Sequence, residues 1–117
     1  MRLLIAGSRS ITDFDLSDFI PTETELIISG GAHGIDQIAE RYADTHKIAK
    51  LIIPPQYKKY GKAAPLKRNE LMIELADAIL IIWDGSSRGT RHTMELAKKS
   101  NKDVTVIHYQ DNDSNTQ

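Results

Sequence analysis

The residues best suited to hold an anion follow two apolar segments of the sequence. The segment DGSSRGT (84–90) comes directly after AILIIW, and SGGAHGID (29–36) comes after ELII. Each combines glycines and small hydroxyl side chains with the start of a helical pattern. Glycines let backbone amides approach a ligand closely, and a helix N-terminus points free N–H groups and its positive dipole end at the same place. The two segments therefore predict two anion-binding loops, with phosphate as the usual occupant.

Each loop also has a purely structural interpretation. The glycines of 29–36 would only make a tight turn, with Asp36 capping the helix, and 84–90 would be an elaborate helix cap. For 29–36 alone the two interpretations carry equal weight. Neither loop has the G-x-G-x-x-G spacing of dinucleotide sites or the G-K-[ST] of a Walker A loop. The occurrence of both loops at one edge of a sheet favours binding.

A third polar segment supplies cations and aromatic side chains. Lysines cluster in residues 58–67 beside Tyr57 and Tyr60, and Arg68 and Asn69 follow at the start of a helical pattern. Aromatic rings beside cations can stack on a base and neutralise a phosphate. A solvated basic loop accounts for most of the lysines, whereas Arg68 and Asn69 are predicted to face the site.

Alternating apolar and amphipathic segments must position these loops. Helical patterns cover 34–47, 65–76 and 89–100, with at most a short helix or turn at 12–20. Strands are predicted at 2–6, 25–29, 49–53, 78–83 and 104–108. The strand segments do not alternate, as expected of parallel strands buried on both faces. The order predicts right-handed βαβ units, hence an α/β fold: a single Rossmann-like three-layer domain with a parallel sheet of about five strands in the order 3-2-1-4-5.

That strand order fixes where a ligand is expected. The direction of winding reverses between the first and fourth strands, and ligands of such sheets bind beyond the carboxyl ends of the strands at this point. All the polar segments follow predicted strands, so they meet at this edge. The predicted ligand-binding residues are Gly7, Ser8, Arg9, Ser29, Gly30, Gly31, Gly34, Asp36, Arg68, Asn69, Asp84, Gly85, Ser86, Ser87, Arg88, Gly89 and Thr90.

Composition excludes several classes of protein. The 117 residues suffice for one domain, expected at 1–109, with a disordered tail at 110–117. The formal net charge of −1 gives no global attraction to nucleic acid or membranes. Cysteine is absent, which excludes disulfides, thiolate metal sites and a cysteine nucleophile. His33 and His92 are not spaced as a metal pair. We expect a cytoplasmic protein with no metal, no cofactor and no membrane segment.

Four motifs together resemble the YspA/YpsA-like branch of the SLOG superfamily. They are GSR (7–9), SGGAHGIDQIAERYA (29–43), YGKAAPLKRNELM (60–72) and ADAILIIWDGSSRGTRHTMELAKK (76–99). The resemblance spans roughly residues 2–108. It implies a Rossmann-like fold that binds a nucleotide or a nucleotide-derived, ADP-ribose-like ligand, as a sensor or sequestering module. A homo-oligomer is a further expectation of the resemblance.

The LOG-type phosphoribohydrolases suggest an enzymatic alternative, nucleotide N-glycosidic hydrolysis. Their motif R-K-x-x-M is similar to RNELM (68–72), and P-G-G-x-G-T-x-E-E is similar to DGSSRGTRHT (84–93). The resemblance puts His92 and Thr93 where the hydrolases have two glutamates, so the carboxylate that would stabilise an oxocarbenium ion is missing there. The remaining catalytic candidates are Arg68, His92 and Glu95. Binding without turnover is therefore the expectation.

The DNA-processing protein A family suggests a third function, single-stranded DNA binding. It has a similar SG.A.GID loop and an RN pair before a helix. With a net charge of −1, strand binding would rest on residues 58–68 alone. A small-molecule partner is therefore expected before a nucleic acid.

Overall fold

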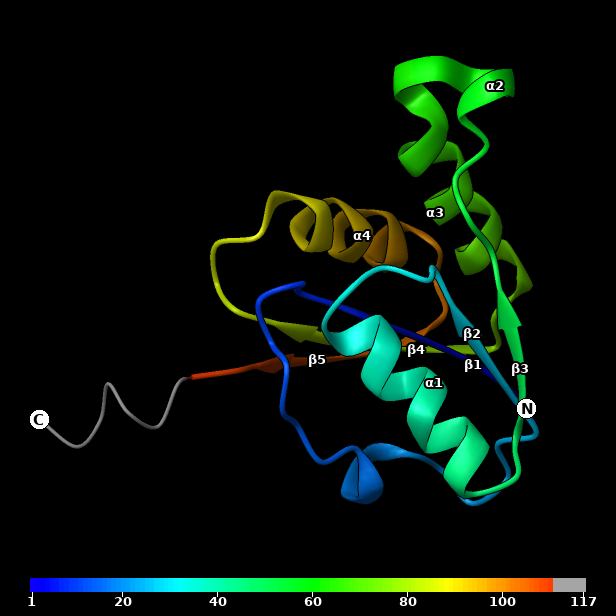
Figure 1. Ribbon diagram of the computed structural model, residues 1–117, viewed down its shortest axis with the longest axis vertical. Coiled ribbons are helices and arrows are strands. Elements are labelled where there is room, and N and C mark those ends of the chain that lie inside the picture. Colours follow the sequence, from blue (N-terminus) through cyan, green and yellow to red (C-terminus); the bar gives the residue numbers. More distant parts are fainter. Residues whose placement is uncertain (111–117) are drawn as a thin grey trace, which may run out of the picture.

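A parallel five-stranded sheet with helices on both faces forms the centre of the protein in the computed structural model, which describes residues 1–110 (Figure 1). The strands are β1 (Arg2–Gly7), β2 (Leu26–Ser29), β3 (Ala49–Ile52), β4 (Ala78–Trp83) and β5 (Asp103–His108). They lie in the order β3-β2-β1-β4-β5, and every neighbouring pair is parallel. The predicted fold class and strand order are confirmed.

Three helices connect the strands close to their predicted positions: α1 (Ile35–Thr45), α3 (Ala64–Leu75) and α4 (Arg88–Lys99). The segment 12–20 contains only the 3₁₀ turn η1 (Ser17–Phe19). The basic segment before α3 is more ordered than a solvated loop, because it contains α2 (Tyr57–Tyr60) and the 3₁₀ turn η2 (Gly61–Ala63).

The two faces of the sheet bury separate apolar clusters because successive strand residues point to opposite sides. Leu3, Ile5 and Ile27 pack with α1 on one face. Leu4, Ile28 and Ile81 pack with α3 and α4 on the other. Burial on both faces explains why the central strands read as continuous apolar runs.

The edge strands are not buried on both faces, so that part of the prediction is wrong. All four residues of β3 are exposed, with Leu51 at 39% and Ile52 at 40%, and Val106 of β5 is 36% exposed. These strands lie at the two ends of the sheet, and α3 packs chiefly on β1 rather than on β3. An apolar run alone does not distinguish a central strand from an edge strand.

The pairing of β1 with β4 sets the geometry of the sheet edge at which the sequence predicts a ligand. Gly7 at the end of β1 pairs with Ile82 of β4, and the chain leaves β1 and β4 toward opposite faces of the sheet. Of the predicted tail, all but Gln110 lies outside the described residues. Among the helices of residues 1–110, none is both long enough and apolar enough to cross a bilayer.

Candidate functional site

A pocket of about 300 Å³ opens at the carboxyl ends of the central strands, between α3 and α4. Both glycine-rich loops border it, through Ala32 on one side and Ser87 on the other. The predicted residues that line it are Gly7, Arg9, Asp36, Arg68, Asn69, Ser87, Gly89 and Thr90. The topology therefore brings the two loops to one cavity.

The other predicted residues do not line the pocket. They are Ser8, Ser29, Gly30, Gly31, Gly34, Asp84, Gly85, Ser86 and Arg88. Five lining residues were not predicted: Ala6, Ala32, Pro65, Met72 and Thr93. Thr93 follows Thr90 by one helical turn and both are buried, so helical spacing could have indicated it.

Asp84 organises the loop 84–90 through its own hydrogen bonds. Its Oδ1 accepts from the amides of Ser86 at 2.9 Å and Ser87 at 2.8 Å. Its Oδ2 accepts from Ser10 Oγ at 2.7 Å. Partial desolvation raises the pKa of Asp84, but the bonds from Ser10, Ser86 and Ser87 outweigh it and hold the pKa at about 2. Two amides that the sequence assigns to a phosphate are therefore occupied by an anionic side chain.

The first turn of α4 keeps donors for a ligand. Ser87 is the N-cap, and its Oγ accepts from the Thr90 amide at 3.4 Å. The amides of Arg88 and Gly89 follow the cap, and helix geometry gives them no intrahelical acceptor. Gly89 also lines the pocket, so these two amides are the donors of this turn that remain open toward it.

Internal bonds likewise hold the loop 29–36. Ser29 Oγ accepts from the Gly31 amide at 3.2 Å and donates to Glu40 Oε2 at 3.0 Å. The Ala32 amide donates to Asp36 Oδ2 at 3.1 Å. The loop is thus folded back onto the first two turns of α1, and its amides at 31 and 32 are occupied.

Arg68 ties this loop to two other elements. Its Nη1 donates to the Gly30 carbonyl at 2.7 Å and to the Ile53 carbonyl at 3.3 Å, and its Nε donates to Asn69 Oδ1 at 3.0 Å. A Cβ at Gly30 would lie 2.7 Å from Nη1, so glycine makes this approach possible. Arg68 therefore links the loop 29–36 to the end of β3 and to α3. It also forms part of the pocket wall.

Asp36 is the carboxylate of the pocket. It is only 7% exposed. Desolvation by burial raises its pKa to about 6, and the nearby Glu40 adds to the rise, while the Ala32 amide and the Arg68 charge oppose it. A carboxyl group with a pKa raised to about 6 thus lies in the wall of the cavity, where a ligand would contact it.

Comparison with known proteins gives two relatives from phages. The chain is 32% identical to the gene 61 protein of Mycobacterium phage D29 over 123 aligned positions, which cover 94% of this chain and 97% of that protein. The chain belongs to the gene 61 protein family. The uncharacterized SPbeta prophage-derived protein YoqJ of Bacillus subtilis (strain 168) is 43% identical over 42 residues, 36% of this chain and 25% of that protein. No family model and no solved structure matches the chain.

In this member of the gene 61 protein family, two catalytic candidates lie away from the pocket. Glu95 is exposed and His92 is half-buried, and neither lines the cavity. Thr90 and Thr93 form the pocket-facing row of α4, and residues 92 and 95 lie on other sides of the helix. The carboxylate that does reach the pocket, Asp36, comes from α1, and a motif comparison along α4 could not reveal it.

Proposed function

We propose that this member of the gene 61 protein family binds a nucleotide or a nucleotide-derived ligand, such as an ADP-ribose-like compound, in the pocket between α3 and α4. One observation carries the proposal: a single cavity combines a free arginine, a helix N-terminus, hydroxyl and amide side chains and a buried carboxylate. Its volume of about 300 Å³ is at the lower end of the range for ligand pockets.

The phosphate is assigned to Arg9 and the start of α4. Arg9 is exposed at the pocket rim, and within residues 1–110 its side chain makes no ion pair or hydrogen bond. A guanidinium can hold two phosphate oxygens at once. The amides of Arg88 and Gly89, at the positive end of the α4 dipole, supply the opposite side.

The remaining lining residues suit a nucleoside. Asp36 and Asn69 offer an acceptor and an amide to ribose hydroxyls, and Thr90 and Thr93 add hydroxyl groups. Ala6, Pro65 and Met72 form an apolar wall against which a base can pack. The resemblance to the SLOG superfamily supports the same ligand class, because its motifs supply both loops and the start of α3. We assign the protein a sensing or sequestering role.

The Arg9→Ala variant tests this assignment. Loss of a charged hydrogen bond of about 1.5–3 kcal/mol should weaken binding at least tenfold, measured by calorimetric titration with nucleoside monophosphates and ADP-ribose. Arg41→Ala, a change of an exposed arginine on α1 that does not line this pocket, is the matched control. The free energy of unfolding should be unchanged in both variants. Failure of the wild type to bind any of these compounds, or equal affinities for both variants, would contradict the proposal.

A second candidate function is N-glycosidic hydrolysis, and the position of Asp36 favours it. A carboxylate near the ribose would stabilise the positive charge that develops on the sugar. Asp36 on α1 would then take the role of the glutamates that α4 lacks. Release of free base from nucleoside monophosphates, measured by chromatography, distinguishes the two functions. If the protein only binds nucleotides, the release of free base should stay at the uncatalysed background. Release that Asp36→Asn abolishes and Glu95→Ala preserves would establish the enzyme instead.

A further inference from the structure

The outer edge of the sheet at β3 is open. In residues 1–110 only β2 pairs with this strand, because β3 is the first in the order β3-β2-β1-β4-β5. Directly after β3, the Ile53 amide donates inward to the Ser29 carbonyl at 2.9 Å. Successive residues of a strand direct their backbone groups to opposite sides, so the N–H and C=O groups of Lys50 and Ile52 point outward. These groups are available to another extended chain.

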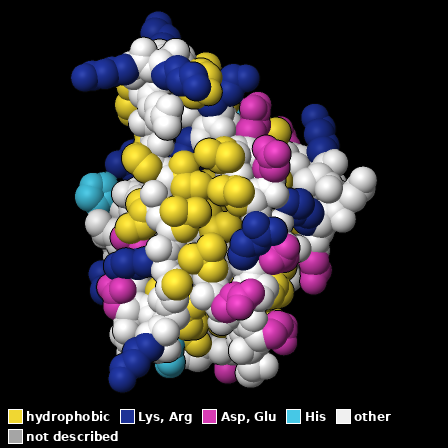
Figure 2. Space-filling model, turned by 90° about the vertical axis from the view of Figure 1, so that its right-hand side faces the viewer, with side chains coloured by type: hydrophobic (Ala, Val, Ile, Leu, Met, Phe, Trp, Pro, Cys, Tyr) yellow, Lys and Arg dark blue, Asp and Glu magenta, His cyan; other side chains and the backbone are white. Residues whose placement is uncertain are grey.

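Exposed hydrophobic side chains lie beside this edge. Of the eight large hydrophobic residues exposed within residues 1–110, six belong to β3, α2 and α3: Leu51, Ile52, Tyr57, Tyr60, Leu66 and Leu71. Leu51 pairs with Ile28, which is buried on the side of the sheet that α3 covers. We call the surface formed by β3, α2 and α3 the β3 face, and Figure 2 shows hydrophobic side chains gathered over its centre. An exposed apolar patch of this kind marks an interaction site.

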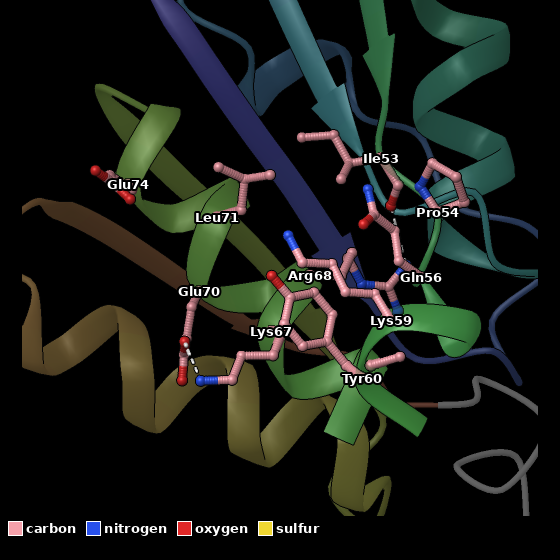
Figure 3. Close-up of a pocket in the computed structure, with 11 residues that line it drawn as sticks. Ile53, Pro54, Gln56, Lys59, Tyr60, Lys67, Arg68, Glu70, Leu71 and Glu74 are labelled. Carbon is pink, nitrogen blue, oxygen red and sulfur yellow. Dashed lines mark hydrogen bonds and ion pairs between the residues drawn. The ribbon is translucent and has the colours of Figure 1, made fainter. Parts of the chain in front are cut away.

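A groove of about 430 Å³ lies between the end of β3 and α3. Figure 3 shows Ile53 and Pro54 on one side of it, Leu71 on α3, and Lys59 and Tyr60 from α2. About half of the lining is polar or charged: Gln56, Lys59, Lys67, Arg68, Glu70 and Glu74. The groove is separate from the ligand pocket, with Arg68 as the one lining residue that they share. It can hold apolar side chains next to polar groups, a combination that a peptide presents.

The β3 face also carries a basic segment. No aspartate or glutamate occurs from residue 45 to residue 69, whereas six lysines and one arginine do. Lys50 pairs with Asp44 at 2.9 Å, and Lys67 pairs with Glu70 at 3.8 Å. The lysines of α2 and η2 stand beyond the carboxyl end of β3 (Figure 1). Within residues 1–110 no ion pair is found for these lysines, which are Lys58, Lys59 and Lys62. Carboxylates of a partner would complement their charge.

We propose that the β3 face binds an extended acidic peptide segment of a partner protein, which adds to β3 as a further strand of the sheet. The peptide backbone bonds to the outward groups of Lys50 and Ile52. Alternate side chains of the peptide cover Leu51 and enter the groove beside Leu71, because successive strand residues point to opposite faces. Carboxylates at the end of the peptide that passes α2 meet Lys59. In strand addition the backbone bonds give affinity and the side-chain pockets give specificity.

A single-stranded nucleic acid uses fewer of these features. The lysines and tyrosines of α2 suit it, but Glu70 and Glu74 in the groove repel its phosphates. A nucleic acid also has no peptide edge with which to pair the outward groups of β3. An acidic peptide uses the open edge, the apolar side chains and the lysines together.

Fluorescence anisotropy with synthetic peptides tests the proposal. Two labelled peptides share a centre of alternating valine and threonine, and they carry three glutamates at the carboxyl end or at the amino end, so that both directions of an added strand are covered. One of them should bind the wild-type chain at least tenfold more tightly than its counterpart with lysines in place of the glutamates. N-methylation along one edge of this peptide should abolish binding and along the other should preserve it, because an added strand pairs along one edge only.

Variants locate the peptide on the β3 face. Leu71→Asp and Lys59→Glu should each weaken binding of the acidic peptide at least tenfold. Val106→Asp is the matched control for Leu71, because Val106 is 36% exposed on β5 at the opposite edge of the sheet, compared with 43% for Leu71. Lys98→Glu, a change of an exposed lysine on α4, is the matched control for Lys59. Both controls should bind like the wild type, and circular dichroism should show all four variants folded.

Arg9→Ala should bind the peptide normally, so failure of the ligand proposal is distinguishable from failure of this one. The peptide proposal is overturned if neither acidic peptide binds, if the lysine counterparts bind equally well, or if both N-methylated forms bind. Equal effects of Leu71→Asp and Val106→Asp also contradict it. A wild-type dimer that Leu71→Asp dissociates in sedimentation would assign the β3 face to a second copy instead. A single-stranded oligonucleotide that binds through Lys59 more tightly than either peptide would assign it to a nucleic acid.

Discussion

The loops 84–90 and 29–36 look alike in sequence but are stabilised in opposite ways. In the first, Asp84 is anionic, with a pKa held at about 2 by hydrogen bonds from Ser10 and nearby amides. In the second, burial raises the pKa of Asp36 to about 6. Asp84 accepts from the amides of Ser86 and Ser87 and from Ser10, whereas a cation, Arg68, donates to the backbone of the second loop at Gly30.

This difference shows what a glycine-rich loop does and does not indicate. Both loops have the residues of a phosphate cradle, yet their own side chains occupy several of their amides. Donors still open to a ligand include the first two amides of α4 and the Arg9 guanidinium. The capacity to bind an anion therefore depends on which amides remain free. The five predictions below test how each loop is held.

Gly34→Ala should have the largest effect on stability. Gly34 has φ +79°, and an added Cβ would overlap the Ser8 carbonyl oxygen and lie 2.7 Å from Arg9 Cα. Strain and overlap together should lower the free energy of unfolding by about 4 kcal/mol, measured by urea denaturation. Gly61→Ala is the matched control, because Gly61 also has positive φ (+57°) but nothing within 4 Å of its Cβ position. Equal losses would show that overlap contributes nothing.

Asp36→Asn should change the pH dependence of stability. The folded pKa of about 6 lies above the ordinary aspartate value of 3.8, so the folded state binds the proton more tightly. Wild-type stability therefore falls as pH rises from about 4 to 6. A difference of about two pKa units corresponds to about 3 kcal/mol. Asp36→Asn should be more stable than wild type by up to this amount at pH 7 and similar to it at pH 4, measured by urea denaturation at each pH.

Asp84→Asn should change the pH dependence of stability in the opposite direction. Because the folded pKa of Asp84 is lowered to about 2, its stabilisation is present above pH 3.8 and disappears as pH falls toward 2. The variant should therefore be less stable than wild type at pH 7, and the gap should close in acid. Parallel pH profiles for the two variants would show that the two loops do not differ as described.

Ser87→Ala should cost about 1 kcal/mol of stability, the usual value for loss of an N-cap, because Ser87 Oγ accepts from the Thr90 amide. Thermal and urea denaturation measure the loss. Ser86→Ala is the control: its hydroxyl bonds to the Asp84 side chain rather than to an amide of α4, and its amide bond to Asp84 remains. If both serines can be replaced without loss of stability, the Ser87 N-cap does not stabilise α4.

Gly89→Ala should have the smallest effect and the opposite sign. Gly89 lies in the first turn of α4, and nothing lies within 4 Å of its Cβ position. Alanine should raise the free energy of unfolding by about 0.5 kcal/mol. The added methyl group borders the pocket, so ligand affinity should fall at the same time. If the variant is more stable but binds the ligand as tightly as the wild type, the first turn of α4 does not contact the ligand.

Particular residues show how far sequence reasoning reached. The apolar runs and the helices that follow the second, third and fourth of them predicted the strand order and the edge at which the loops meet. Arg68 was predicted to face a ligand, but its bonds to Gly30 and Ile53 depend on a contact between distant segments. Asp36 was placed correctly at the start of α1, and only the packing around it shows that it is buried and that burial raises its pKa to about 6.

The sequence by itself determined the parallel α/β fold, because hydrophobic periodicity and strand–helix alternation are local properties of the chain. Tertiary structure alone decided three features: which amides of the two loops stay free, which carboxylate reaches the pocket, and which strands lie exposed at the edge of the sheet. These features depend on distances between segments far apart in the chain. Burial and hydrogen-bond partners, which set pKa values and leave donors open, follow from those distances rather than from residue type.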